Sequence, residues 1–559
     1  MRSNARSRAL AYAGPACAGL LAIASLGGCT GQIDDGPLTT TRSAGASRFP
    51  RLSHEQWENA ARDLLHLDAV PGDSAPWDPE TTSGIFQNVG AELGVTGSLW
   101  EDYRDAAERV ALEVAGDPDA LARVLPRGVS AGDEAGFVRG FGLRAYRRPL
   151  TEAEERAYLA AFGAAAPHYP ALGPFEAGVA QTIATMLQSP NFLYRVERSA
   201  TDDPFAARVA LDGFEIATRL SFALWNSIPD DALLAAAAAG ELATEEGVRA
   251  EATRMLADPR ADVALLRFHH LLLATASYSQ ITRENPELFP EYTPAHRTSM
   301  VGEVDAFVRD VVLERDLGIE ELLTADYTFA DARIAGLYDE PGPTGEAFER
   351  IDLDGETRAG ILTMPGFLAS NATSLETDPI HRGVFVARRI VCAELPAPPN
   401  GVPPLPADDS RARSMRERIE AHTSTGVCGS CHARTINPLG YPFERFDALG
   451  RLQVVELRTG AAIDTASSYE LDGAQVEYDD AVELTTLLAA SPQVHDCYAR
   501  HLAEFLFAER PVRRAVIRRG GEVSLGGGGT RDVVLAIVTD ELFRTRPNAP
   551  YDGPAPNAE

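Results

Sequence analysis

The stretch Ser53-His54-Glu55-Gln56 is followed by Trp57, Ala61, Leu64 and Leu65. A serine followed three residues later by a glutamine is typical of a helix N-terminus, where each side chain caps a backbone N–H of the other. The apolar residues that follow recur at helical spacing and so predict one buried face. The stretch therefore predicts that the folded part of the chain begins with an amphipathic helix.

The same signals recur further along the chain. Thr151-Glu152-Ala153-Glu154 and Asp212-Gly213-Phe214-Glu215 are capping patterns that open two more helices. No sustained alternation of apolar and polar residues marks a large sheet, so we predict a mainly α fold with short strands near 453–457 and 469–471. Further helices are expected at residues 171–193, 247–257, 262–274, 294–313, 331–337, 358–370, 379–392 and 532–543.

Composition bounds the class of protein. The chain has 559 residues, of which 45% are hydrophobic and 24% charged, which excludes a wholly disordered chain and a polytopic membrane protein. The formal net charge of −30 argues against nucleic acid as a partner, because phosphate binding needs a basic face. The sequence contains no lysine, which excludes Schiff-base chemistry on a lysine and a phosphate-loop lysine.

The amino terminus has the pattern of an export signal. Arg2, Arg6 and Arg8 precede an apolar stretch at 16–26, which is shorter than the ~20 residues of a membrane span. The sequence Leu26-Gly27-Gly28-Cys29 resembles the lipobox of bacterial lipoproteins. That resemblance implies cleavage before Cys29, a lipid on its thiol and anchoring at the outer membrane, facing the periplasm or the cell surface. An ordinary secretory signal with a chance cysteine is the alternative.

The sequence Cys428-Gly429-Ser430-Cys431-His432 is a CxxCH motif. This is the attachment signature of c-type haem, in which both thiols bond the haem vinyl groups and the histidine is the proximal iron ligand. We therefore expect one covalent haem c. The alternatives are a zinc site, with His422 or Cys497 as a further ligand, and a disulfide across the two motif cysteines. Zinc sites space their cysteine and histidine ligands apart, whereas Cys431 and His432 are adjacent.

The distal iron ligand is less determined. Ala412, Met415, Ile419 and His422 share one helical face, so His422 is the first candidate and Met415 the second. A later stripe that includes Cys497 turns His501 inward and His495 outward, which makes His501 another candidate. Met364, His381 and an open five-coordinate iron complete the alternatives.

Other residues extend this interpretation. Three arginines lie close to the motif in sequence, namely Arg434, Arg445 and Arg451. We expect them to neutralise the haem propionates, with solvated surface arginines as the alternative. Cys392 and Cys497 are expected to form a disulfide, with two buried free thiols as the alternative. A proline-rich stretch predicts an extended linker between the helical body and the haem module.

The expected organisation has seven parts. They are a lipoprotein signal peptide (1–28), a flexible tether (29–48), an N-terminal helical domain (49–149), a helical body (150–393), a Pro-rich linker (394–410), a c-type haem module with C-terminal helices (411–545) and a disordered tail (546–559). The expected fold class is a multi-helical body followed by a small cytochrome-c-like haem module with few short strands.

Several blocks resemble an uncharacterised multidomain family of planctomycetes and myxobacteria, whose parts are known only as domains of unknown function. The resemblance rests on the stretches 49–57, 143–150, 189–194, 217–222, 324–329, 358–362, 381–383, 437–440 and 446–450. Members often carry a c-type haem signature at this place, so the resemblance implies an exported haem protein. The family pattern Met-Asp-Pro after the motif is replaced here by Ile436-Asn437-Pro438, which removes a methionine ligand at that point.

Together these observations predict an exported, lipid-anchored, monohaem c-type cytochrome-like protein with a redox or electron-transfer role, serving a redox partner protein or an oxidoreductase activity of the helical body. The alternative is a non-redox helical binding or scaffold lipoprotein, in which the CxxCH motif is a structural zinc or disulfide clip. Its only expected membrane contact is the N-terminal lipid. Whether the helical body is catalytic is left open.

Overall fold

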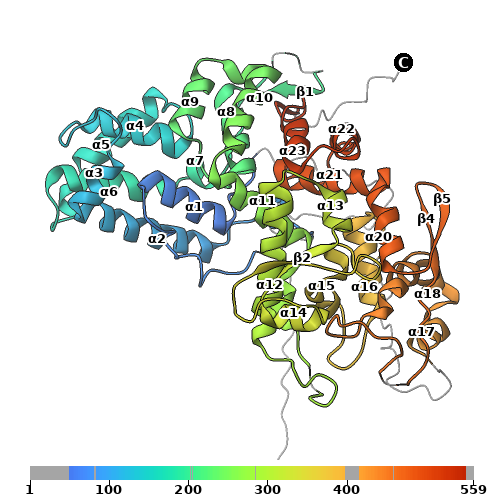
Figure 1. Cartoon of the computed structure of the whole chain (residues 1–559). Coiled ribbons are helices and arrows are strands. Elements are labelled where there is room, and N and C mark those ends of the chain that lie inside the picture. Colours follow the sequence, from blue (N-terminus) through green and yellow to red (C-terminus); the bar gives the residue numbers. More distant parts are fainter. Residues whose placement is uncertain are drawn as a thin grey trace, which may run out of the picture. The chain divides into compact units, whose positions relative to one another are not determined.

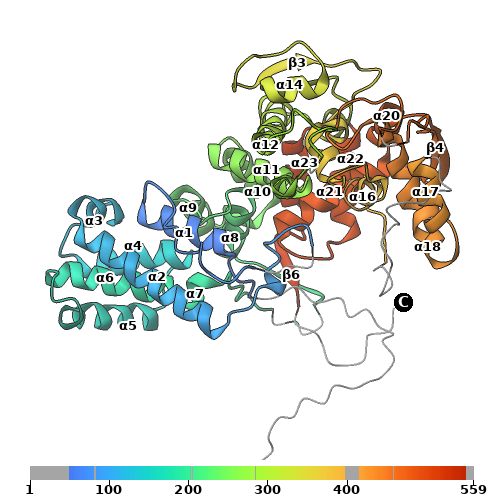
Figure 2. The ribbon, with the colours of Figure 1, turned by 90° about the horizontal axis from the view of Figure 1, so that it is seen from below.

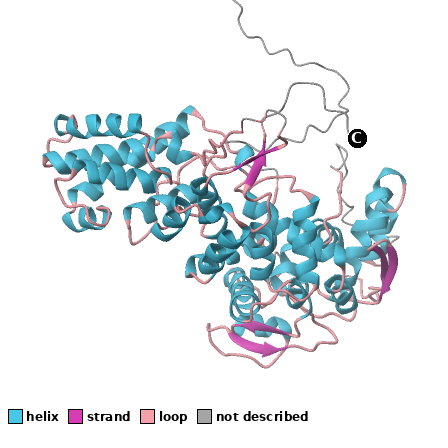
Figure 3. Ribbon diagram, turned by 90° about the horizontal axis from the view of Figure 1, so that it is seen from above, coloured by secondary structure: helices cyan, strands magenta, loops and turns pink. Residues whose placement is uncertain are grey.

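The computed structural model describes residues 49–80, 84–201, 203, 206–283, 285–396, 414–457 and 459–548. The predictions for the signal peptide, Cys29, the tether, most of the linker and most of the tail lie outside these residues. The predicted disordered tail is wrong at its start, because Arg546 and Pro547 belong to a short strand that pairs with residues 208–210. The described chain is mainly helical, with three antiparallel two-stranded sheets (Figure 3). The predicted mainly α fold is confirmed. No described helix has both the length and the apolar character needed to cross a membrane.

The first helices build their own hydrophobic core. All three caps expected from sequence form, and in the first the backbone N–H of Gln56 donates to Ser53 Oγ at 3.2 Å. Trp57 and Tyr103 are fully buried in this core. The helices are α1 (His54–Leu65), α2 (Gly97–Gly116), α3 (Pro118–Val124), α4 (Glu134–Tyr146), α5 (Glu152–Gly163), α6 (Pro174–Leu187) and α7 (Pro190–Leu193).

A second, larger core joins segments from both sides of the predicted linker. Figure 1 shows the late helices α20–α23, in red and orange, among the green and yellow helices. The helices before the linker are α8 (Gly213–Leu224), α9 (Asp231–Ala238), α10 (Glu245–Leu256), α11 (Pro259–Leu272), α12 (Ala295–Val308), α13 (Ile319–Thr324), α14 (Ala332–Tyr338), α15 (Pro365–Ser370) and α16 (Pro379–Phe385). Those after it are α17 (Met415–Thr423), α18 (Gly426–Cys431), α19 (Asn437–Gly440), α20 (Ala481–Ala489), α21 (Pro492–Phe507), α22 (Arg514–Leu525) and α23 (Thr530–Val538).

The strands are short and lie at the margins of the helices. The pairs are β1 (Arg208–Ala210) with β6 (Thr545–Pro547), β2 (Tyr327–Ala330) with β3 (Glu349–Asp352), and β4 (Ser467–Leu471) with β5 (Ala474–Tyr478). The strand predicted at 469–471 is confirmed within β4. The strand predicted at 453–457 is wrong, since only one isolated bridge, Val455 to Ala462, forms there.

The helix predicted over 358–370 is also wrong. Gly360 has a φ of +54°, a left-handed value that interrupts a helix, and Met364 is extended. Pro365 then starts α15, because proline suits the first turn of a helix and not its interior. The single helix predicted over 171–193 is likewise two, with Pro190 starting α7.

Helix α16 holds the segment after the CxxCH motif against the body at very short range. A Cβ at Gly383 would overlap the carbonyl oxygen of Ile436, and one at Gly440 would overlap that of Pro379. Arg382 is fully buried and donates to the carbonyls of Phe443, Phe446 and Asp447 at 2.7–3.0 Å. Glycine pairs and a buried guanidinium thus fix where the motif segment leaves the body.

Candidate functional site

The CxxCH motif occupies α18 and the π-helical turn η8 (His432–Ile436) that follows it. Figures 1 and 2 both show α18 next to α17 at the edge of the molecule. None of the six residues of α18 is buried, and Val427 is 75% exposed. Cys428 and Cys431 are half-buried free thiols. The structure therefore presents two thiols and an apolar side chain on a helix that the described protein leaves uncovered.

The π-turn brings Asn437 into hydrogen-bonding contact with His432. The backbone N–H of Asn437 donates to the carbonyl of His432, five residues earlier, as a π-helix requires. Pro438 follows and has no N–H to donate to the carbonyl of Arg434, which disfavours ordinary helical bonding here. The Asn437 side chain consequently lies against the imidazole, with Oδ1 at 3.2 Å from His432 Nδ1.

The surrounding hydrogen bonds fix which nitrogen of His432 carries a proton. Thr423 Oγ1 donates to the carbonyl of Ile419 at 2.7 Å, so it accepts from Asn437 Nδ2 at 2.9 Å. This orients the buried amide so that its oxygen faces His432. A carbonyl oxygen only accepts, so Nδ1 must be the donor, and Nε2 of the neutral ring keeps its lone pair for a metal.

The donor atoms of the motif do not form a compact group. Among described residues, the one group of three side chains with ligand atoms within 4.8 Å of one another is Cys392, Cys497 and His501, not the motif. Tetrahedral zinc would bring its ligand atoms within about 4 Å of each other. Two thioether positions and an axial imidazole have no such requirement, so the motif residues are compatible with a covalent haem.

A cavity of about 440 Å³ lies beside this turn. Ala433, Asn437 and Tyr441 line it together with the β4–β5 hairpin, whereas the two motif cysteines and His432 do not. A group attached to the motif would therefore be partly exposed to solvent.

The structure separates the candidates for the distal ligand. Met415 and Ile419 are buried, whereas His422 is exposed, so the protein itself covers only part of the predicted shared face. Met415 packs with Ile419 and Tyr441, and its sulfur lies 2.9 Å from Arg418 Nη2, which is the environment of a core residue. His422 as a ligand stays a prediction.

His381 belongs to α16, the helix that packs against the segment after the CxxCH motif. The side chain is 71% exposed and is paired with Asp378 at 2.5 Å, and this hydrogen bond raises the pKa of His381. Met364 is buried in the second core.

Cys392 and Cys497 form a disulfide with a Cα–Cα distance of 5.5 Å. Cys497 is therefore not a zinc ligand for the motif, which corrects that alternative. His501 Nε2 lies 3.4 Å from Cys497 Sγ, and burial lowers the pKa of His501 to about 3. The prediction that His495 points outward is wrong: it is buried and hydrogen-bonded to Ser524 Oγ at 2.7 Å, because α22 covers that side of α21.

The arginines near the motif differ in their surroundings. Arg451 is paired with Asp447 and Glu291 at 2.6 and 2.5 Å, so its guanidinium already has two carboxylate partners, and its role towards haem propionates stays a prediction. Arg434 is exposed and Arg445 is half-buried. Their role towards propionates stays a prediction.

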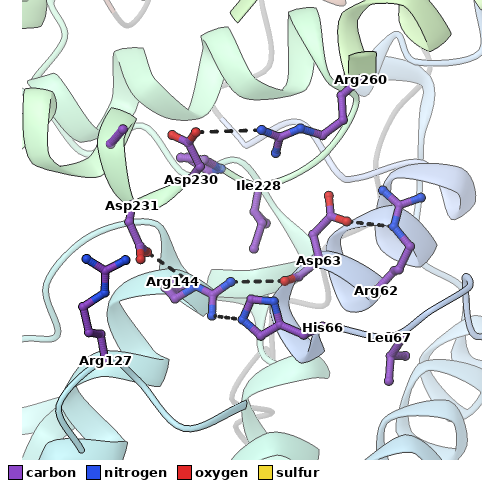
Figure 4. Close-up of a pocket in the computed structure, with 12 residues that line it drawn as sticks. Arg62, Asp63, His66, Leu67, Arg127, Arg144, Ile228, Asp230, Asp231 and Arg260 are labelled. Atoms are coloured by element: carbon purple, nitrogen blue, oxygen red, sulfur yellow. Dashed lines mark hydrogen bonds and ion pairs between the residues drawn. The ribbon is translucent and has the colours of Figure 1, made fainter. Parts of the chain in front are cut away.

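Sequence reasoning missed a second site, because its residues are far apart along the chain and form no motif. A cavity of about 870 Å³ opens between α1, α4 and the start of α9 (Figure 4). Four arginines and three aspartates line it, together with His66. The only sequence signal was the abundance of arginine, which does not indicate where arginines meet.

Comparison with known families divides the chain into four matched regions. The models are PSD3, protein of unknown function (DUF1587), at 50–116; PSD5 (DUF1595) at 134–197; PSD4 (DUF1592) at 211–339; and PSCyt3 (DUF1588) at 358–456. The chain is thus a multidomain protein built from regions of unknown function, as the resemblance implied. The PSCyt3 match contains the whole CxxCH motif. No curated protein and no solved structure matches the chain.

Proposed function

We propose that this chain is an exported c-type haem protein with a redox or electron-transfer role. In this proposal Cys428 and Cys431 bond the haem covalently and His432 binds its iron through Nε2. The observation that carries it is the Asn437 hydrogen bond, because it makes Nδ1 of His432 the donor and so leaves Nε2 as the ring nitrogen that can face a metal, beside two free thiols.

The residues around the motif would each have a defined task. Haem bound here would supply one-electron chemistry at its iron. Asn437 would hold the imidazole in one tautomer and raise its basicity, as outer hydrogen-bond partners of ligating histidines do. Thr423 would hold the amide of Asn437 in the orientation that this requires.

Other features support the proposal without establishing it. The PSCyt3 match covers the motif, and the uncovered α18 offers an apolar surface beside the two thiols. The net charge of −30 would favour a positively charged redox partner through long-range attraction. Lipidation of Cys29 would keep the protein at the outer membrane, close to other proteins of the cell envelope.

The test is an absorption spectrum of the mature protein produced together with the cytochrome c maturation machinery. We expect a c-type reduced α-band that survives acid–acetone extraction in the wild type and in Ser430→Ala, which keeps both cysteines and the histidine. The double variant Cys428→Ala/Cys431→Ala should lose covalent retention of the haem. His432→Ala should change the absorption bands that report histidine as an iron ligand. Addition of carbon monoxide then separates an open iron, suited to catalysis, from a closed one, suited to electron transfer. A colourless wild-type protein that holds about one zinc would overturn the proposal in favour of a structural clip.

A further inference from the structure

We propose that the 870 Å³ cavity between α1, α4 and α9 binds a small ligand through an oxyanion group, which Arg144 and Arg127 recognise. The shared chemistry is a carboxylate, sulfate or phosphate group. This site is separate from the CxxCH motif and independent of the haem proposal.

Arg144 is a poorly compensated cation in the cavity wall. Its side chain is 18% exposed, and its Nη atoms donate to His66 Nε2 at 2.8 Å and to the carbonyl of Asp63 at 3.1 Å. Both acceptors are neutral. Its nearest carboxylate partner, Asp231, is 3.8 Å away and itself 74% exposed, and the carboxylate of Asp63 acts on it from a longer distance. A cation removed from water without a close counterion is costly, and an incoming anion would offset that cost.

The other carboxylates of the wall are engaged by other donors. Asp63 accepts from Arg62 at 2.7 Å through one oxygen and from Ser227 at 2.6 Å through the other. Asp230 accepts from both terminal nitrogens of Arg254 and also caps α9 through the N–H of Leu233. These groups therefore do not compete for the free N–H groups of Arg144.

His66 contributes a neutral ring of known tautomer. A guanidinium only donates, so His66 Nε2 must accept from Arg144 and the proton must be on Nδ1. Burial and the neighbouring Arg144 both lower the pKa of His66, which keeps the ring neutral near pH 7. The ring thus supports Arg144 without adding charge, and Nδ1 is a second kind of donor in the wall.

Arg127 supplies the solvent-exposed half of the recognition. Figure 4 shows its guanidinium near the carboxylate of Asp231, the residue that also pairs with Arg144. It is exposed, and within the described part of the chain it makes no ion pair. Four arginines against three aspartates give this wall a net positive charge, although acidic residues outnumber arginines 81 to 51 over the whole chain. A local inversion of charge around a cavity is what anion recognition requires.

The cavity draws on three of the matched regions. Arg62 and His66 come from the first, Arg144 from the second, and Asp231 from the third. Ligand sites occur preferentially where such parts meet.

The test is calorimetric titration of the full mature protein with sodium sulfate, sodium phosphate and sodium glucuronate at constant ionic strength. We expect saturable binding of at least one of them, and the tightest of the three identifies the oxyanion. Arg127→Gln should weaken this binding at least tenfold without affecting the fold, because the side chain is exposed. The control Arg156→Gln removes an arginine that is 72% exposed and lies outside the cavity, and should bind as the wild type.

Asp231→Asn tests the proposal with a change of affinity in the opposite direction to that of Arg127→Gln. Removal of the carboxylate that faces Arg144 should tighten anion binding several-fold. The proposal is overturned if none of the three probes binds saturably, or if Arg127→Gln behaves like Arg156→Gln. Weaker binding in Asp231→Asn would also overturn it, because it would mean that the carboxylate recognises a cationic group of the ligand.

Discussion

The side-chain oxygen of Asn437 lies 3.2 Å from Nδ1 of His432, and the backbone N–H of the same asparagine donates to the carbonyl of that histidine. One residue therefore holds both the main chain and the ring of the candidate iron ligand. The π-turn is what permits this, because its wider hydrogen bonding brings residues five apart into contact.

The first prediction concerns the reduction potential of the haem protein. Asn437→Asp gives Nδ1–H a stronger acceptor, makes His432 more basic and should lower the potential, whereas Asn437→Leu should raise it. A hydrogen bond worth about 1 kcal/mol corresponds to about 40 mV for one electron. Redox titration of covalently loaded protein measures this shift.

Thr423→Val is the companion variant for that measurement. It frees the amide of Asn437 to rotate, so its potential should move in the same direction as in Asn437→Leu, by a smaller amount. Equal potentials in all variants would show that Asn437 is a structural residue only.

The second prediction concerns the contact between α16 and α19. Alanine at Gly383 or Gly440 would place a Cβ into a backbone carbonyl and force the two helices apart. Each variant should lose about 1–3 kcal/mol of unfolding free energy, the usual cost of overpacking. Gly336→Ala is the control, because nothing lies within 4 Å of a Cβ there, and it should be neutral or slightly stabilising. Chemical denaturation measures all three, and equal stabilities would contradict the close contact.

Local signals predicted much of the fold. The caps at Ser53 and Thr151 formed as the sequence indicated, because each depends on residues three apart. The errors came from features that local patterns do not contain. The apolar spacing over 358–370 predicted one helix, but the backbone conformations of Gly360 and Met364 interrupt it. His495 was assigned to an outer helix face, which α22 covers.

The two candidate sites differ in the same way. Cys428, Cys431 and His432 are adjacent in sequence, so their chemistry could be inferred directly. Asn437 was noticed only as a departure from a family pattern, because its contact depends on a π-turn. Residues such as His66 and Arg144 meet only through tertiary packing, and no periodicity could bring them together.

The third prediction concerns the disulfide between Cys392 and Cys497. It closes a loop of 105 residues, for which the chain-entropy model gives about 4–5 kcal/mol of stabilisation. The double variant Cys392→Ser/Cys497→Ser should lose unfolding free energy of that order and keep the covalent haem, because the motif uses other cysteines. Loss of haem attachment together with stability would instead mean that the motif depends on this core.

The fourth prediction concerns pH and Glu303. This carboxyl is fully buried, and one of its oxygens accepts from Tyr338 at 2.5 Å and from Thr328 at 2.8 Å. Burial raises the pKa of Glu303 to about 7, against an ordinary value of 4.5. Below pH 4.5 the carboxyl is protonated in both the folded and the unfolded chain and adds no pH dependence. Between pH 4.5 and 7 the folded chain keeps a proton that the unfolded chain has lost, so stability falls as pH rises.

Glu303→Gln should remove this loss, because the amide keeps an acceptor for Tyr338 and Thr328 and has no charge to bury. The variant should gain up to about 3 kcal/mol relative to the wild type at pH 8 and little at pH 4.5, from 1.36 kcal/mol per pKa unit. Urea denaturation at the two pH values measures the difference. Glu152→Gln is the matched control, since that side chain is 95% exposed and should change stability equally little at both. A gain for Glu303→Gln that is the same at both pH values would show that the carboxyl is ionised in the folded protein, held so by Tyr338, Thr328 and the nearby Arg358.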